Sequence, residues 1–157
     1  MAGNAPTFEI PSLPNAHVTI ISARWHREIC QSMVDGAKRA LSIAGINSPG
    51  LVEVAGSFEL PLAAKYALDA GADAAIVLGV VVRGETPHFD YVCQGVTDGV
   101  MKVSLESGKP IGFGVLTVDT IEQAIARSGI PGSKEDKGFD SAVAALDLLK
   151  IKKELEN

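Results

Sequence analysis

Residues 74–82, AAIVLGVVV, constrain the fold more than any other segment of the chain because they are apolar throughout. A strand with one face in water alternates apolar and polar residues, whereas a continuous apolar run is typical of a strand covered on both faces. Such strands occur in parallel sheets that carry a layer of helices on each side. The run therefore predicts a central strand of a parallel sheet.

Strand and helix patterns alternate along most of the chain. Apolar runs predict strands at residues 17–23, 51–56, 74–82 and 111–118. Helical spacing, with Pro61 in a first turn and Gly45 and Gly71 as stop signals, predicts helices at 25–45, 59–71, 88–108, 120–129 and 138–157. Because this order implies parallel pairing through helical crossovers, we predict an α/β fold: a flavodoxin-like three-layer α/β/α sandwich with a four-stranded parallel sheet.

The first 16 residues contain three prolines and little periodicity, so we expect an extended N-terminal arm there. Residues 17–157 have a length suited to a single domain. The N-terminus has neither a basic start nor an apolar core segment, and no apolar run reaches transmembrane length. We therefore expect no secretory signal, no membrane span, and the cytoplasm as the default compartment.

Charge and cysteine content argue against several classes of function. The formal net charge is −5, so the chain lacks the basic footprint of a nucleic-acid-binding protein. Cys30 and Cys93 are too few for a disulfide framework, and we expect each to act as a small buried hydrophobic residue. No histidine or cysteine spacing resembles a metal site.

Ligands of parallel α/β sheets bind beyond the carboxyl ends of the strands, so the loops there hold the candidate site. The loop from Arg83 to His88 follows the apolar strand. Thr86 suits a helix N-cap and Pro87 a first helical residue, which leaves free N–H groups to bind an anion such as phosphate beside His88. The alternative is a well-capped helix with an exposed histidine.

Three further residues have two interpretations each. Trp25, the only tryptophan, stacks on a flat heterocycle, or it packs in a core or interface. Glu59 accepts hydrogen bonds from a ligand, or it interacts with the positive end of the helix beside it. Arg127 pairs with a phosphate, or it contacts the last carbonyl groups of its own short helix.

Familiar motifs of other α/β proteins are absent from the sequence. It has no GxxxxGK[ST] segment, no GxGxxG segment after a strand and no GxSxG elbow. A response-regulator receiver carries acidic residues after its first strand, where this chain has Ala23-Arg24-Trp25. The same segment, ARWHRE, is not the Thr- and Ser-rich phosphate loop of a flavodoxin.

Several segments, taken in order, resemble lumazine synthase, the penultimate enzyme of riboflavin biosynthesis. They cover nearly the whole chain and include IISARWHREI, VAGSFELP, ALDAGADAAIVLGVVVRGETPHFDYV, KPIGFGVLTVDTIEQAIARSG and EDKGFDSAVAAL. The ARWH, TPHFDYVC and EDKG variants are similar to the actinobacterial branch. The resemblance implies a transferase that condenses 5-amino-6-(D-ribitylamino)uracil with 3,4-dihydroxy-2-butanone 4-phosphate and releases phosphate and water, with no cofactor and no metal.

The resemblance also implies roles for individual residues. Trp25 stacks on the pyrimidine, His88 is the catalytic proton-transfer residue, and Arg127 pairs with the phosphate. The remaining substrate-binding residues are Ser57, Phe58, Glu59, Val80, Val81 and Val82 around the ring and ribityl chain, Glu85 and Thr86 in the phosphate loop, and Phe113 and Lys137, which with Arg127 reach in from the neighbouring subunit.

Further implications of the resemblance concern partners. Adjacent subunits share active sites, so the partners are the two small-molecule substrates, inorganic phosphate and other copies of the chain. The loop SGIPGSKEDKG looks longer than the short form of icosahedral members, which favours a homopentamer. The N-terminal arm is suited to pair with the sheet edge of a neighbouring subunit. A non-catalytic lumazine- or flavin-binding assembly protein on the same scaffold is the alternative.

Overall fold

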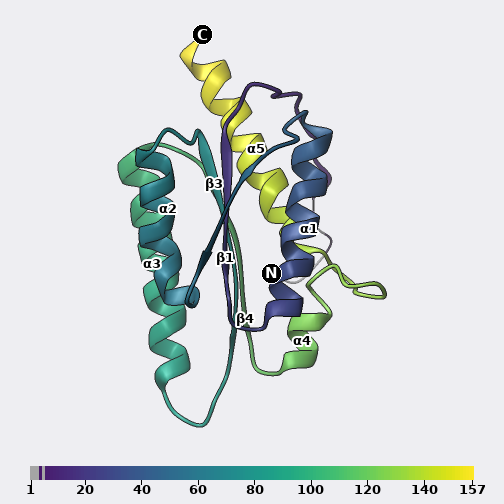
Figure 1. Ribbon diagram of the computed structural model, residues 1–157, viewed down its shortest axis with the longest axis vertical. Coiled ribbons are helices and arrows are strands. Elements are labelled where there is room, and N and C mark those ends of the chain that lie inside the picture. Colours follow the sequence, from purple (N-terminus) through teal and green to yellow (C-terminus); the bar gives the residue numbers. More distant parts are fainter. Residues whose placement is uncertain (1–3, 5) are drawn as a thin grey trace.

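A four-stranded sheet forms the centre of the computed structural model, which describes residue 4 and residues 6–157. The strands are β1 (Val18–Ala23), β2 (Gly50–Val54), β3 (Ala74–Val82) and β4 (Ile111–Val118). Neighbouring strands run parallel in the order β2-β1-β3-β4 (Figure 1). The apolar strand β3 therefore lies inside the sheet, between β1 and β4, as its sequence predicts.

Helices cover both faces of this sheet (Figure 1). One face carries α1 (Arg27–Ile43), α4 (Ile121–Ile125) and α5 (Lys137–Glu156), and the other carries α2 (Leu60–Asp69) and α3 (His88–Ser107). The buried apolar residues form two clusters, and β3 contributes to both, with Ile76 in the first and Val77 in the second. The predicted three-layer α/β/α sandwich is confirmed.

The starts of two helices differ in detail from the sequence predictions. α1 begins at Arg27 rather than at residue 25, because the backbone of His26 is left-handed, with φ 55° and ψ 56°. α3 begins at His88 with Pro87 as its N-cap, so the prediction of Thr86 as the N-cap is wrong by one residue. Thr86 still contributes to the helix start, because its hydroxyl accepts a long hydrogen bond of 3.4 Å from the His88 N–H.

The short helix α4 is predicted at residues 120–129 but ends at Ile125. Thr120 caps its start, since the Thr120 hydroxyl accepts a hydrogen bond from the Gln123 N–H at 3.3 Å. Beyond the helix the chain folds back on itself, and the carbonyl of Ala126 accepts hydrogen bonds from residues 134 and 135. Arg127 therefore lies after α4, in the segment that leads to α5.

Helices α1 and α5 approach one another closely at Gly138. A Cβ atom added to Gly138 would overlap the backbone carbonyl of Met33, which has no flexible group to move aside. Asp136, the N-cap of α5, accepts a hydrogen bond from the Phe139 N–H at 3.0 Å and pairs with Arg39 of α1. These contacts fix the start of α5 against α1.

The described part of the N-terminal arm packs partly on its own chain. Leu13 and Ala16 are buried in the same cluster as α1, and the Leu13 N–H donates a hydrogen bond of 2.8 Å to the end of that helix. Residues 6–9 are exposed. The predicted arm of residues 1–16 lies in part outside the described residues, at 1–3 and 5.

The two cysteines are both free thiols; Cys30 is fully buried and Cys93 is half-buried. Within the described part of the chain, no helix has the length and apolar character needed to cross a bilayer. Among the same residues, no group of three or more His, Cys, Asp or Glu side chains is placed to hold a metal ion. Cys30 thus fits the expected buried role more closely than Cys93 does.

Candidate active site

A pocket of about 400 Å³ lies at the carboxyl ends of β1, β2 and β3. β1 and β3 are neighbours in the sheet, but the chain continues from them to opposite edges, β2 and β4. Ligands of such sheets bind at this switch point, and the volume suits a small molecule. The residues that line the pocket are Trp25, His26, Gly56, Ser57, Phe58, Glu59, Val80, Val81, Val82, His88 and Val92.

Trp25, in the loop after β1, forms one wall of the pocket. Its side chain is 68% exposed, so it is not a core residue. The indole lies against the backbone of Gly56, where a Cβ atom would be 3.2 Å from Trp25 Cδ1. The His26 ring is tilted by 46° against it, with 6.4 Å between the ring centroids. An exposed flat ring beside a pocket can stack on a planar ligand.

The turn after β2, a 3₁₀ helix at Ser57–Glu59, brings two polar side chains to the pocket. Ser57 is 7% exposed, and its hydroxyl has no hydrogen-bond partner among the residues the structure describes. Burying such a group is unfavourable, and a ligand in the pocket can supply the missing partner. Glu59 Oε2 accepts a hydrogen bond from the Gly56 N–H at 2.9 Å, so one carboxylate oxygen makes the helix-start contact foreseen as its alternative role.

Strand β3 and the start of α3 complete the pocket. Val80, Val81 and Val82 are the last residues of β3 and supply apolar surface. His88 is the first residue of α3 and is exposed, and Val92 follows one turn later on the same helical face. The imidazole of His88 therefore borders the same pocket as the indole of Trp25.

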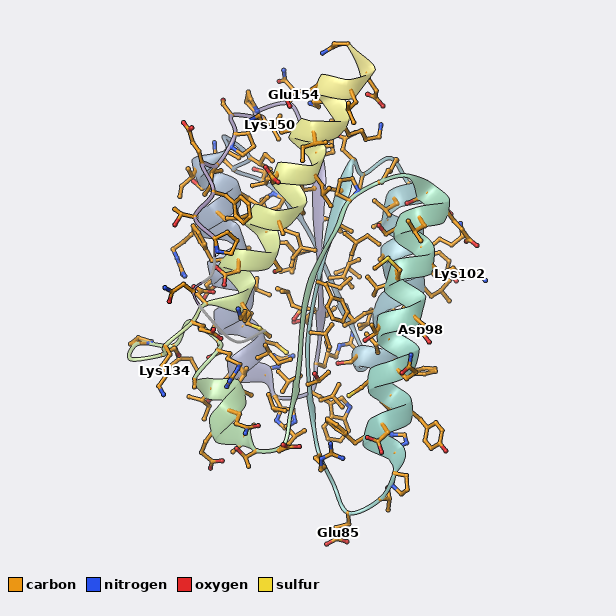
Figure 2. The ribbon with its side chains drawn as sticks, turned by 180° about the vertical axis from the view of Figure 1, so that it is seen from behind. Glu85, Asp98, Lys102, Lys134, Lys150 and Glu154 are labelled. Atoms are coloured by element: carbon orange, nitrogen blue, oxygen red, sulfur yellow. The ribbon has the colours of Figure 1, made fainter. Side chains whose placement is uncertain are left out.

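The loop between β3 and α3 does not line the pocket within this chain. Glu85 lies at its tip and points away from the rest of the molecule (Figure 2). Arg83 Nε is 2.7 Å from Asp119 Oδ1, and the hydrogen bond between them raises the pKa of Arg83. A second carboxylate, Asp90, lies 3.5 Å from Arg83 Nη1. The charge of Arg83 is thus already compensated by two carboxylates of its own chain.

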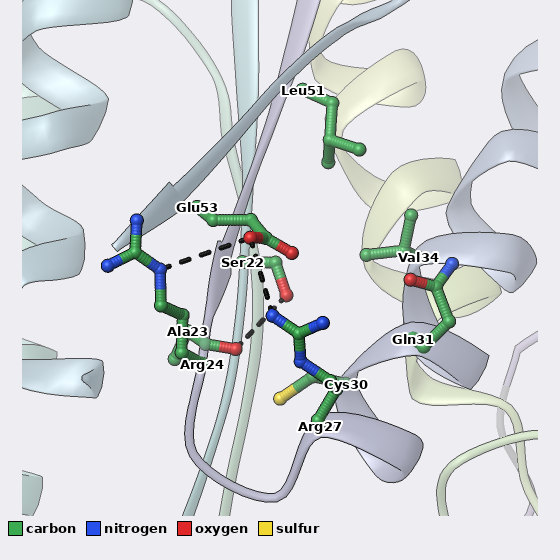
Figure 3. A pocket seen from close by; sticks show the side chains of 9 residues that line it. All are labelled: Ser22, Ala23, Arg24, Arg27, Cys30, Gln31, Val34, Leu51 and Glu53. Carbon is green, nitrogen blue, oxygen red and sulfur yellow. Dashed lines mark hydrogen bonds and ion pairs between the residues drawn. The ribbon is translucent and has the colours of Figure 1, made fainter. Parts of the chain in front are cut away.

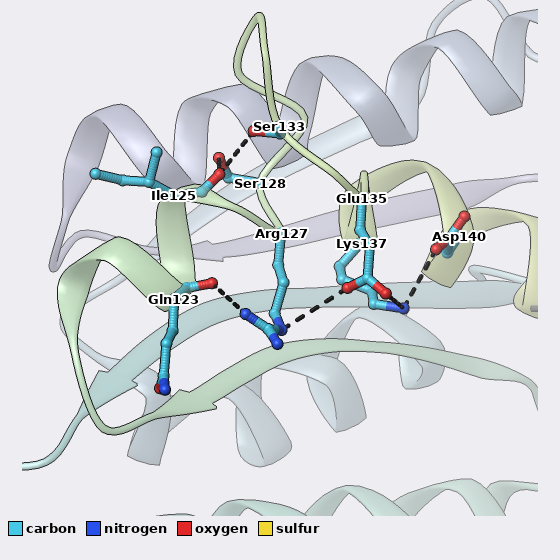
Figure 4. A network of polar contacts seen from close by, with 8 residues as sticks. All are labelled: Gln123, Ile125, Arg127, Ser128, Ser133, Glu135, Lys137 and Asp140. Atoms are coloured by element: carbon cyan, nitrogen blue, oxygen red, sulfur yellow. Dashed lines mark hydrogen bonds and ion pairs between the residues drawn. The ribbon is translucent and has the colours of Figure 1, made fainter. Parts of the chain in front are cut away.

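The residues predicted to come from a neighbouring subunit lie outside the pocket of their own chain. Phe113 is on the edge strand β4 and is 42% exposed. Arg127 Nη1 donates a hydrogen bond of 2.8 Å to the carbonyl of Gln123, which is the alternative role predicted for it (Figure 4). Glu135 lies 3.7 Å from Arg127 Nε and 3.7 Å from Lys137 Nζ. A single chain therefore does not bring Phe113, Arg127 or Lys137 to its pocket.

A much smaller crevice of about 10 Å³ lies between β2 and the start of α1. Glu53 of β2 lies there between two guanidinium groups, 3.9 Å from Arg24 Nε and 3.8 Å from Arg27 Nη2 (Figure 3). The buried thiol of Cys30 also lines this crevice. Its volume is that of about one water molecule, so it cannot hold a substrate.

Three residues of the larger pocket were not among the predicted site residues. His26 reaches the pocket through a left-handed backbone conformation that no sequence pattern marks. Gly56 contributes a close backbone surface rather than a side chain. Val92 is signalled only by its position four residues after His88, which places both on one helical face.

The fold and the pocket together define a class of protein: a flavodoxin-like α/β sandwich with an aromatic-walled pocket at the switch point of its sheet. Residues 15–153 match the family described as 6,7-dimethyl-8-ribityllumazine synthase. The chain belongs to this family.

Similar proteins come from several actinobacteria, each named 6,7-dimethyl-8-ribityllumazine synthase. The chain is 53% identical to that of Streptomyces coelicolor over 142 residues, which cover 90% of this chain and 88% of the relative. It is 50% identical to that of Clavibacter michiganensis subsp. michiganensis over 149 residues (93% and 92%). It is 48% identical to that of Frankia casuarinae over 153 residues (97% and 95%). The resemblance found in the sequence, including its actinobacterial character, is confirmed.

Proposed function

We propose that the protein condenses 5-amino-6-(D-ribitylamino)uracil with 3,4-dihydroxy-2-butanone 4-phosphate to 6,7-dimethyl-8-ribityllumazine, as a transferase of riboflavin biosynthesis. The observation that carries this proposal is the one pocket that unites Trp25, Ser57 and His88 at the switch point of the sheet. The first substrate is a planar ring with a chain of hydroxyl groups, and the second is a small phosphorylated ketone. The pocket offers an aromatic wall, polar groups and a proton carrier to match them.

The pyrimidine substrate stacks on Trp25 beside the apolar end of β3. The hydroxyl of Ser57 has no partner among the described residues, so a hydrogen bond to the ribitylaminouracil satisfies it. Glu59 Oε2 accepts the hydrogen bond from the Gly56 N–H. The second oxygen of the carboxylate accepts hydrogen bonds from the substrate. Holding both substrates in a reactive arrangement accounts for several kcal/mol of the barrier.

His88 transfers protons during the condensation. The substrate amine attacks the ketone, and loss of water gives an imine; later steps eliminate phosphate and close the second ring. Each step moves a proton to or from nitrogen, carbon or oxygen, and an imidazole both accepts and donates one. General acid–base catalysis of this kind contributes roughly 10²–10⁴ in rate. His88 is suited to it because its ring borders the pocket from the exposed start of α3.

The phosphate of the second substrate binds between the start of α3 and Arg127 of a neighbouring subunit. Arg127→Ala is expected to raise the KM for the butanone phosphate far more than the KM for the pyrimidine, because only the former carries the phosphate. Arg127→Lys restores part of the loss, since an ammonium group cannot form the two parallel hydrogen bonds of a guanidinium.

Steady-state kinetics with each substrate varied in turn check this prediction. Inorganic phosphate is expected to compete with the butanone phosphate in the parent enzyme. Equal increases of both KM values in Arg127→Ala would instead assign the residue a structural role.

We further propose that the chain forms a closed homopentamer in which adjacent subunits share five sites. Phe113, Arg127 and Lys137 lie outside their own pocket, so only a neighbouring copy can bring them to one. The edge strand β2 exposes Leu51 and Val52 at 46% and 43%, and unprotected apolar edges of this kind are normally covered. A neighbour's arm suits this edge, and a repeated head-to-tail contact closes into a ring. Light scattering is expected to give five times the chain mass; a monomer would contradict the proposal.

The synthase reaction itself is tested by incubating the purified protein with both substrates and following the absorbance and fluorescence of the lumazine product. Formation of the product that depends on both substrates and on enzyme concentration is the expected result. A protein that binds lumazine or flavin but forms no product would be the non-catalytic assembly protein instead.

A further inference from the structure

The turn that carries Trp25 into the pocket has an unfavourable backbone conformation. His26 is the only non-glycine residue with a positive φ in the described part of the chain, at 55°. L-residues rarely adopt this left-handed region, so the surrounding structure has to hold it in place. Strained residues of this kind concentrate at ligand sites. The orientation of the indole next to His26 therefore depends on the contacts that hold the turn.

Backbone hydrogen bonds fix both sides of the turn. The Arg24 N–H donates to the carbonyl of Val54 at 3.0 Å, and the Cys30 N–H donates to the carbonyl of His26 at 3.0 Å. The ion pairs of Arg24 and Arg27 with Glu53 are exposed and longer, so solvent screens them. None of these contacts reaches Trp25 itself.

One side chain does contact Trp25 from behind the pocket. The thiol of Cys30 donates a hydrogen bond of 3.3 Å to the carbonyl of Trp25. Cys30 is 2% exposed, and its burial raises the pKa of the thiol to about 11, so it keeps its proton at neutral pH. A buried thiol in this state is a hydrogen-bond donor and not a nucleophile.

We infer that Cys30 is a positioning residue for substrate binding, because its thiol holds the carbonyl of Trp25 and thereby fixes the indole wall of the pocket. Cys30 does not line that pocket, so it acts on the substrate only through Trp25. This inference rests on the proposed function in one respect: the ring that stacks on Trp25 is the pyrimidine of the synthase reaction.

Three substitutions of Cys30 separate positioning from packing. Cys30→Ser keeps a donor but loses apolar character, Cys30→Val fills the space but has no donor, and Cys30→Ala loses both. If the thiol positions Trp25, Cys30→Val and Cys30→Ala raise the KM for the pyrimidine by about three- to ten-fold, and Cys30→Ser changes it less. The KM for the butanone phosphate stays within about two-fold in all three, because that substrate does not stack on Trp25.

The matched control is Cys93→Ala, which removes the other free thiol of the chain from α3. It is expected to leave both KM values unchanged. A packing role for Cys30 gives the opposite order, with Cys30→Val close to the parent protein and Cys30→Ser the most impaired. That order, or equal changes of both KM values, would overturn the inference.

A second measurement does not depend on catalysis. Trp25 is the only tryptophan, so emission excited at the red edge of the indole absorption band, where the two tyrosines do not absorb, reports on this indole alone. Without substrates, Cys30→Val is expected to lower the fluorescence anisotropy and raise the rate of acrylamide quenching, whereas Cys30→Ser and Cys93→Ala keep the parent values. Unchanged emission properties in Cys30→Val would overturn the inference even if the parent protein is an active synthase. If the parent protein forms no lumazine, the proposed function fails, while this emission test still decides the role of Cys30.

Discussion

Replacing His88 with alanine is expected to lower kcat by about ten- to a thousand-fold, because the substitution removes the proton carrier that we propose for the pocket. The fold is expected to be retained, since the side chain is exposed at the start of α3. Stopped-flow or steady-state measurement of lumazine formation, together with circular dichroism, tests both statements. The loss is incomplete because positioning of the substrates by the rest of the pocket remains.

His17→Ala is the matched control for this variant. His17 lies just before β1 at the opposite end of the strand from Trp25, with Nδ1 3.7 Å from Asp73 on an exposed surface. Its replacement is expected to leave kcat unchanged. Full turnover in a folded His88→Ala variant would show that His88 takes no part in the mechanism.

Replacing Gly138 with alanine is expected to destabilise the protein by about 3 kcal/mol or more, because the new methyl group meets the backbone carbonyl of Met33. Helix propensity acts in the opposite direction: alanine is favoured over glycine inside a helix by about 1 kcal/mol. The steric effect outweighs the propensity because the new Cβ atom is bonded to the backbone of α5 and meets the backbone of α1, so neither group can turn aside. Urea denaturation of the two proteins measures the difference in the free energy of unfolding.

Gly84→Ala is the control for this stability change. A Cβ atom at Gly84 meets nothing within 4 Å, so the free energy of unfolding is expected to stay within about 0.5 kcal/mol of the parent value. A Gly138→Ala protein as stable as the parent would show that α1 and α5 can separate at little cost.

Much of the fold follows from burial that the sequence itself displays. β3 and β4 begin and end at the predicted residues, 74–82 and 111–118, because their apolar runs coincide with the covered strands. The start of α1 and the end of α4 depend instead on the path of the chain in the folded structure. The left-handed backbone of His26 delays α1, and hydrogen bonds from residues 134 and 135 to Ala126 end α4 early. No local pattern encodes either event.

The candidate site divides in the same way. Trp25, Ser57 and His88 follow three separate strands, and the parallel strand order brings them to one edge of the sheet. Sequence reasoning can therefore foresee their meeting. The thiol contact of Cys30 depends on the exact path of the turn, so only the structure reveals it. Arg127 is a different case, because its predicted role needs a second chain.

The central claim, that two chains build each synthase site around the pocket, is tested most directly by mixing His88→Ala with Arg127→Ala protein under conditions that dissociate and reassemble the rings. With random mixing, roughly a quarter of the interfaces join an intact His88 to an intact Arg127 of the neighbouring chain. At limiting butanone phosphate, the rate of lumazine fluorescence is predicted to rise well above the sum of the two separate variants. No gain in rings that mass spectrometry shows to be mixed would contradict the account.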